Sequence, residues 1–227
     1  EVKTFSGPDD LNLEPSTVVI AIDVFGNMDS MINGVEFLTD RSGLGAAVTN
    51  EGVVEKNGVT VTTTASNSID NWAGQQAFTG NDQDSVNNLS LVMQDIRWEG
   101  APNPLTIDVD GLVPGALYEI QLLFNEGADR NRGWDIAVND ELVVDNISSE
   151  GIQDVNTWAP DIGAFYSGNF NALENGSINV EMRNNIGGQD QVSSDGNPIL
   201  QGFILHLAVP AAPFEITDIN LIDGIPT

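Results

Sequence analysis

The chain has 227 residues and no cysteine, and 34 acidic residues against 7 basic ones give it a formal net charge of −27. Disulfides, zinc–thiolate sites, iron–sulfur clusters and cysteine nucleophiles are therefore excluded. A surface of this charge repels phosphates and anionic lipid, so we expect no nucleic-acid partner. We also expect no membrane insertion, because no apolar run reaches the roughly 18–20 residues that a spanning helix needs.

The first half of the chain alternates short strands with polar loops. Residues 1–16 are polar and contain a Gly-Pro turn, which predicts an extended N-terminal arm. Residues 17–25 form the first expected strand, and apolar residues on both of its faces favour a central position in a sheet. Further strands are expected at 35–39 and 59–64, and the glycine-rich stretch between them, 43–58, is expected to be a loop.

The second half continues the pattern. Residues 66–88 form the longest irregular stretch, and apolar residues at helical spacing predict one short helix over 86–95. A strand at 105–109 precedes residues 117–147, where period and turn chemistry predict a β-meander. Later strands are expected at 165–170, 177–182 and 199–209. The predicted class is all-β, a β-sandwich or jelly roll with at most one or two short helices. One domain would cover 17–209, with 210–227 a linker and a strand that either docks here or opens a following module.

Several of these segments resemble the malectin-like family of galactose-binding-like jelly rolls. The resemblance rests on three segments: the strand ending Leu-Leu-Phe-Asn-Glu (122–126), the Arg-Gly-Trp-Asp-Ile-Ala-Val-Asn-Asp strand (132–140) and the closing Asp-Gly-Asn-Pro (195–198). The resemblance implies a carbohydrate ligand held by loop aromatics and by Asp195. Gly127, Ala128 and Asp129 stand where the family has an aromatic pair, which calls the family's glucose-disaccharide specificity into question.

The candidate binding residues lie in three loop regions, 66–98, 126–133 and 189–197. Aromatic faces suit the apolar side of a sugar ring, and amide, carboxylate and guanidinium groups suit its hydroxyls. Arginines 130 and 132 stand out because cations are scarce, although they also suit an ion-pair network. The predicted ligand-binding residues are Trp72, Trp98, Glu126, Arg130, Arg132, Asp195 and Asn197.

Calcium is the one cofactor that the sequence suggests. Asp82 and Asp84 place carboxylates two residues apart, and hard cations take oxygen ligands. The spacing does not match an EF-hand loop, so these residues predict at most one structural Ca²⁺.

Three functions follow from these observations. The first is a secreted or cell-surface carbohydrate-binding module, non-catalytic and lectin-like, with a bacterial origin in a saline or marine setting. The second is a structural subunit of a surface layer, matrix or fibre, in which copies of the chain assemble by strand pairing. The third is a glycoside hydrolase or lyase that uses the acid-rich loop with Glu126, Asp129 and Asp135. His206 is expected to be a satisfied strand residue, and no Gly-x-Ser-x-Gly motif is present.

Overall fold

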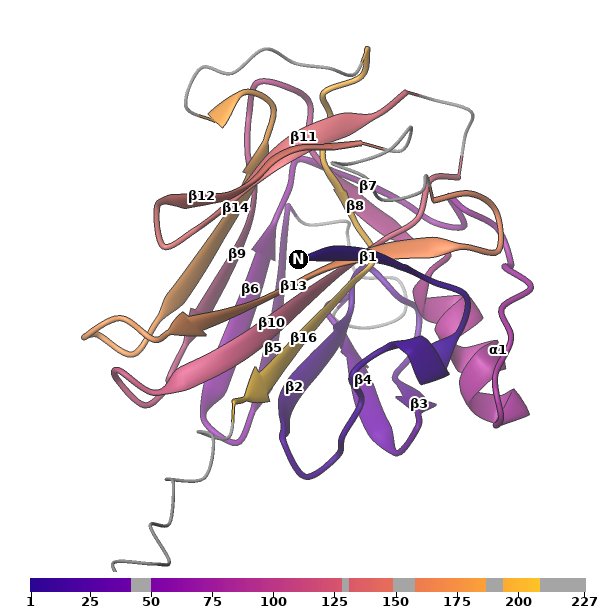
Figure 1. The fold of residues 1–227 in the computed structure, drawn as a ribbon, viewed down its shortest axis with the longest axis horizontal. Helices are drawn as coiled ribbons and strands as arrows, with labels where there is room; N and C mark the ends of the chain where they lie inside the picture. Colours follow the sequence, from indigo (N-terminus) through magenta and orange to yellow (C-terminus); the bar gives the residue numbers. More distant parts are fainter. Residues whose placement is uncertain (42–49, 128–130, 149–157, 187–193, 209–227) are drawn as a thin grey trace, which may run out of the picture.

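The computed structural model describes residues 1–41, 50–127, 131–148, 158–186 and 194–208, which form two large facing β-sheets (Figure 1). The seven-stranded sheet has the order β1 (Val2–Phe5), β13 (Gly163–Asn171), β10 (Leu117–Phe124), β16 (Gly202–Leu207), β2 (Val18–Asp23), β4 (Val35–Thr39), β3 (Ser30–Ile32). The six-stranded sheet has the order β12 (Glu141–Ser148), β11 (Gly133–Val138), β14 (Ile178–Arg183), β9 (Leu105–Asp110), β6 (Val59–Thr64), β5 (Glu51–Lys56). The predicted all-β sandwich is confirmed.

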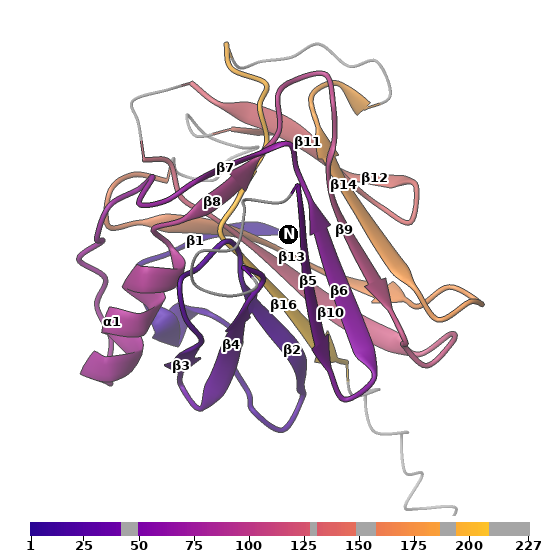
Figure 2. The same ribbon diagram turned by 180° about the vertical axis from the view of Figure 1, so that it is seen from behind.

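A third, three-stranded sheet lies at one end of the sandwich. Its order is β15 (Ile199–Leu200), β8 (Ile96–Trp98), β7 (Asn67–Ile69). Figure 2 shows β7 and β8 between the helix α1 (Gln83–Val92) and the six-stranded sheet. A single 3-10 turn, η1 (Pro8–Asp10), completes the elements of the described residues. None of the helices in these ranges is long and apolar enough to cross a membrane.

The seven-stranded sheet is buried on both faces. Ile20 and Ile22 of β2 face the six-stranded sheet and belong to the main core, whereas Ala21 belongs to a second cluster. This second cluster includes Leu89 and Val92 of α1, which cover the outer face of the sheet. The double burial of β2 confirms the central position that its apolar sequence predicts.

The predicted meander over 117–147 is wrong in part. Asn139 and Asp140 have positive φ angles of 49° and 66° and join β11 to β12 as a two-residue hairpin, as expected. β10, however, pairs with β13 and β16 in the opposite sheet. Turn residues specify a hairpin only when the connection is tight, and the eight residues between β10 and β11 let the chain cross between the sheets.

Other predictions shift at the element ends. α1 begins at Gln83 rather than Val86, because Asp82 caps it: its carboxylate accepts hydrogen bonds from the Ser85 amide at 2.9 Å and from the Ser85 hydroxyl at 2.5 Å. The second half of the loop expected at 43–58 is the edge strand β5, whereas residues 42–49 lie outside the described ranges. Within the predicted arm, β1 pairs with β13 along its whole length.

Candidate functional site

A pocket of about 100 Å³ opens beside the three-stranded sheet. Two half-buried tryptophans, Trp72 and Trp98, supply aromatic surface, and Ile69 and Ile96 supply apolar floor. Arg132 and Asn197 contribute the polar lining. Four of the predicted binding residues, from four separate segments of the chain, therefore meet at one pocket.

Arg132 is the centre of a buried network behind this pocket. It is only 4% exposed, and its Nε lies 2.7 Å from Oε2 of Glu126. Its Nη2 lies 3.4 Å from Oδ2 of Asp195, and its Nη1 donates to the backbone oxygen of Asn197 at 2.9 Å. The guanidinium also lies over the Trp72 ring, with 5.6 Å between Cζ and the ring centroid. One side chain thus holds three loops in place.

Glu126 and Asp195 hold this arginine from behind the pocket. Glu126 is 9% exposed, and its partner is the guanidinium. The backbones of Asp195 and Arg132 form an isolated β-bridge. Oδ1 of Asp195 also accepts a hydrogen bond from the Asn197 amide at 3.1 Å. Both carboxylates thus position Arg132, and their direct contact with ligand stays a prediction.

The side-chain amide of Asn197 has an oxygen that holds a neighbouring loop and a nitrogen that donates no hydrogen bond within the described residues. Its Oδ1 accepts a hydrogen bond from the Ala101 amide at 2.8 Å, which fixes the neighbouring loop. Its Nδ2 donates no hydrogen bond to a group in the described part of the chain, and Asn197 is one of the residues that line the pocket. The site therefore presents an amide donor next to two aromatic side chains, an arrangement that suits a sugar hydroxyl and ring.

Two residues that sequence reasoning missed bring the loops together. A Cβ placed on Gly127 would lie 2.1 Å from the backbone oxygen of Trp72, so only glycine permits this close approach. Gln201, fully buried between β15 and β16, accepts from the Asn125 amide at 2.9 Å and donates to the Asn125 oxygen at 2.5 Å. In the sequence, the only signals for these roles are a glycine in a polar loop and an isolated glutamine within an expected strand, and neither is specific.

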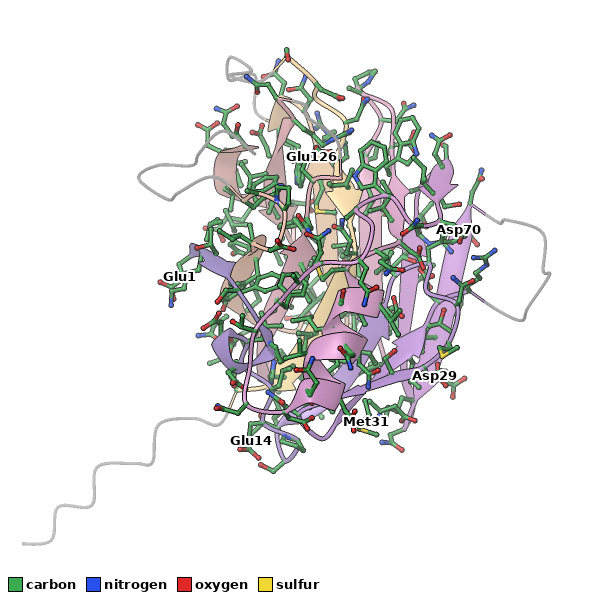
Figure 3. The ribbon with its side chains drawn as sticks, turned by 90° about the vertical axis from the view of Figure 1, so that its right-hand side faces the viewer. Glu1, Glu14, Asp29, Met31, Asp70 and Glu126 are labelled. Atoms are coloured by element: carbon green, nitrogen blue, oxygen red, sulfur yellow. The ribbon has the colours of Figure 1, made fainter. Side chains whose placement is uncertain are left out.

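The remaining predicted residues lie elsewhere. Arg130 is outside the described residues. Asp82 and Asp84 line an open hollow of about 650 Å³ at the start of α1, where Asp82 is the helix cap. The hydrogen bonds from Ser85 lower the pKa of Asp82. Figure 3 shows Glu126 at the upper end of the molecule, away from Met31, which lines this hollow with the two aspartates.

The acid-rich loop does not present a pair of free carboxylates in the described residues. Glu126 is bound to Arg132, and Asp129 lies outside these residues. Asp135 is fully buried and accepts hydrogen bonds from the amides of Asn146 and Ile186 at 2.8 and 2.6 Å. Burial raises the pKa of Asp135, an effect that these two hydrogen bonds oppose.

Other candidate side chains are part of the core. Trp134 is 1% exposed and packs against Trp158, with 6.1 Å between the ring centroids. His206 is 2% exposed and lies 3.4 Å from both Thr17 and Gln121, which confirms its structural role. Burial lowers the pKa of His206, although the charge of Glu119 acts in the opposite direction.

No protein-family model matches the sequence, and no curated protein matches it either. Solved structures do resemble it. The ectodomain of ANX2 from Arabidopsis thaliana has a TM-score of 0.56 and 12% identity over 83% of this chain and 49% of that one. The ANX1 ectodomain from the same plant has a TM-score of 0.53 and 15% identity, over 92% of this chain and 54% of the other. The complex of plant peptide RALF23 with FER and LLG2 has a TM-score of 0.50 and 15% identity.

This chain thus spans about half the length of the ectodomains that it resembles. At these identities the similarity concerns the fold alone. The neighbours are malectin-like ectodomains, and together with the two facing sheets they show that the fold of this chain is malectin-like.

Proposed function

We propose that the chain is a non-catalytic carbohydrate-binding module of an extracellular protein, and that it binds sugar at the Trp72–Trp98 pocket. The observation that supports this most directly is the convergence of two half-buried tryptophans with the amide of Asn197 around one opening. Sugars present an apolar ring face and several hydroxyls, which these side chains match.

The size of the pocket limits what it holds. Pockets that enclose a whole small molecule measure roughly 300–1,000 Å³, and this one measures about 100 Å³. The proposed ligand therefore inserts the edge of one sugar unit, and the rest of an oligo- or polysaccharide lies across the surface. Arg132 would act by fixing the Trp72 ring, because its own donors already hold Glu126 and Asn197.

The strand-pairing alternative finds less support. The N-terminal arm is already paired with β13 of its own chain and Phe5 is 2% exposed, so the arm is not free to exchange into a neighbouring copy. Strand pairing between copies would have to use the outer edge of β1, which is the edge strand of its sheet. The glycosidase alternative needs two carboxyl groups roughly 5–10 Å apart beside a substrate. Both described acids of the proposed catalytic loop are instead buried in fixed hydrogen bonds.

The test is a glycan-array screen of the purified chain, followed by titration calorimetry on the best oligosaccharide. Trp72→Ala and Trp98→Ala are each expected to weaken binding by about 1–3 kcal/mol, the cost of truncating an anchoring aromatic residue. Phe170→Ala is the matched control. Phe170 is a partly buried aromatic residue of β13, and it pairs with Tyr118 at the end of β10 that lies away from Glu126.

Circular dichroism of each variant separates lost binding from lost folding. The assignment would be refuted if no glycan on the array bound the chain. It would also be refuted if the two tryptophan variants bound sugar with the same affinity as the wild type.

A further inference from the structure

A second pocket, of about 70 Å³, lies where the turn after β2 meets the end of α1. Its oxygen-bearing residues are Asp23, Asn27, Ser30, Gln94 and Asp95. A void of this size has room for an ion and several waters, because one water needs only about 10–15 Å³.

Asp23 is the unusual residue of this pocket. It is 2% exposed, yet its Oδ1 has no hydrogen-bond partner in the described part of the chain. A buried carboxylate without a partner is costly, and native proteins normally pair such groups. The backbone also makes room for it, because a Cβ on Gly26 would lie 2.0 Å from Oδ2 of Asp23.

The guanidinium groups nearby bind other acids. Arg97 pairs with Asp40 at 2.7 Å, and Arg41 pairs with Asp70 at 2.5 Å. Asp23 and Asp95 form no ion pair in the described residues, although both face the same pocket.

The two carboxyl groups also repel each other. Burial, followed by the charges of Asp95, Asp40 and Asp29, raises the pKa of Asp23 well above its ordinary value. Burial raises the pKa of Asp95 too, while a hydrogen bond from the Asn71 amide opposes that shift. Figure 3 shows Asp29 on the same side of the molecule as Asp70, the partner of Arg41.

We propose that this pocket binds one hard divalent cation, Ca²⁺, between the carboxylates of Asp23 and Asp95. Two carboxylates balance its charge, and the side-chain oxygens of Ser30 and Gln94 with several waters provide the six to eight oxygen ligands that Ca²⁺ takes. Asn27 is not counted among them, because its Oδ1 accepts a hydrogen bond from Arg41 at 3.0 Å and its Nδ2 donates to Oδ2 of Asp95 at 3.4 Å. The described residues contain no group of three or more His, Cys, Asp or Glu side chains arranged as a metal site, so neutral oxygens must complete the shell. This site is separate from the predicted Asp82–Asp84 position.

The site is independent of the sugar-binding proposal, and its test uses no sugar. Calorimetry with CaCl₂ on the EDTA-treated, dialysed chain is expected to show one site per chain. Asp23→Asn, which keeps shape and removes the charge, should weaken that binding roughly tenfold or more. Asp110→Asn, at the exposed end of β9, makes the same change in net charge and should bind like the wild type.

Thermal unfolding provides the second measurement. Ca²⁺ should raise the Tm of the wild type and of Asp110→Asn but not of Asp23→Asn. In EDTA, Asp23→Asn should be the more stable protein, because the unpartnered carboxylate is gone. Asp95→Asn keeps an oxygen for the Asn71 amide and serves as the second variant if Asp23→Asn fails to fold.

Two outcomes would overturn the site. One is an equal Tm increase in Asp23→Asn, Asp95→Asn and the wild type, which would mean diffuse binding to the acidic surface. The other is an increase that NaCl at the same ionic strength reproduces, which would mean charge screening.

Discussion

At the scale of single residues, Arg132 shows that a binding site depends on groups that do not themselves bind. Its guanidinium is buried against Glu126 and Asp195, and it supports the Trp72 ring. Removal of one partner from such a pair leaves an uncompensated buried charge, which costs far more than the pair contributes. Arg132 therefore belongs to both the stability and the binding function of the chain.

Arg132→Met is expected to lower the free energy of unfolding by about 3–5 kcal/mol, because the Glu126 carboxylate remains buried without its cation. The double variant Arg132→Met, Glu126→Gln should recover part of this loss, since the stranded charge is gone. Urea unfolding of the two single variants and the double variant measures the coupling.

Arg183→Met provides the matched control. Arg183 pairs with Glu181 at the surface, its side chain is 34% exposed, and its loss should cost at most about 1 kcal/mol. Equal effects for Arg132→Met and Arg183→Met would mean that the buried network contributes nothing special to stability.

At the scale of elements, the site forms where two loops touch through their backbones. The loop after β10 reaches the Trp72 segment at Gly127, where an added methyl group would lie 2.1 Å from a backbone oxygen. Neither loop can retreat freely, because Gln201 holds Asn125 on one side and Asp95 holds Asn71 on the other. The pocket is thus positioned by regular strands, and strands and loops each supply half of its lining residues.

Gly127→Ala is therefore expected to displace the Trp72 segment and to weaken sugar binding about tenfold, with a loss of stability of about 1–3 kcal/mol from the forced contact. Gly100→Ala is the control, since a Cβ on Gly100 meets nothing within 4 Å. Calorimetry with the glycan from the array, and urea unfolding of both variants, measure the two effects. A Gly127→Ala variant that binds sugar like Gly100→Ala would show that this loop contact does not shape the pocket.

At the scale of the whole molecule, the sequence predicts what local periodicity and turn chemistry encode. The expected strand at 59–64 agrees with β6, and the Asn139-Asp140 hairpin has its expected turn. Whether β10 pairs with its sequence neighbour or with a distant strand depends on long-range packing, which no local pattern contains. The same limit separates residues that line the pocket, such as Trp98, from those that stand behind it, such as Asp195.

The net charge of −27 is a property of the whole chain, and it predicts a response to salt. Like charges on a compact molecule repel one another, and folding brings them closer together than they are in the unfolded chain. Screening shortens the reach of these charges from about 30 Å at 0.01 M salt to about 3 Å at 1 M. Salt should therefore stabilise the folded state.

In EDTA at pH 7, we expect the Tm to rise steadily with NaCl over this range, as differential scanning calorimetry can measure. The same series near the sequence pI of about 4.1 is the control, because protonation there removes most of the net charge and with it most of the salt response. A Tm that salt leaves unchanged at pH 7 would mean that the fold spaces or pairs its carboxylates well enough to cancel their repulsion. A similar slope at both pH values would instead point to salt acting on apolar burial, which does not depend on net charge.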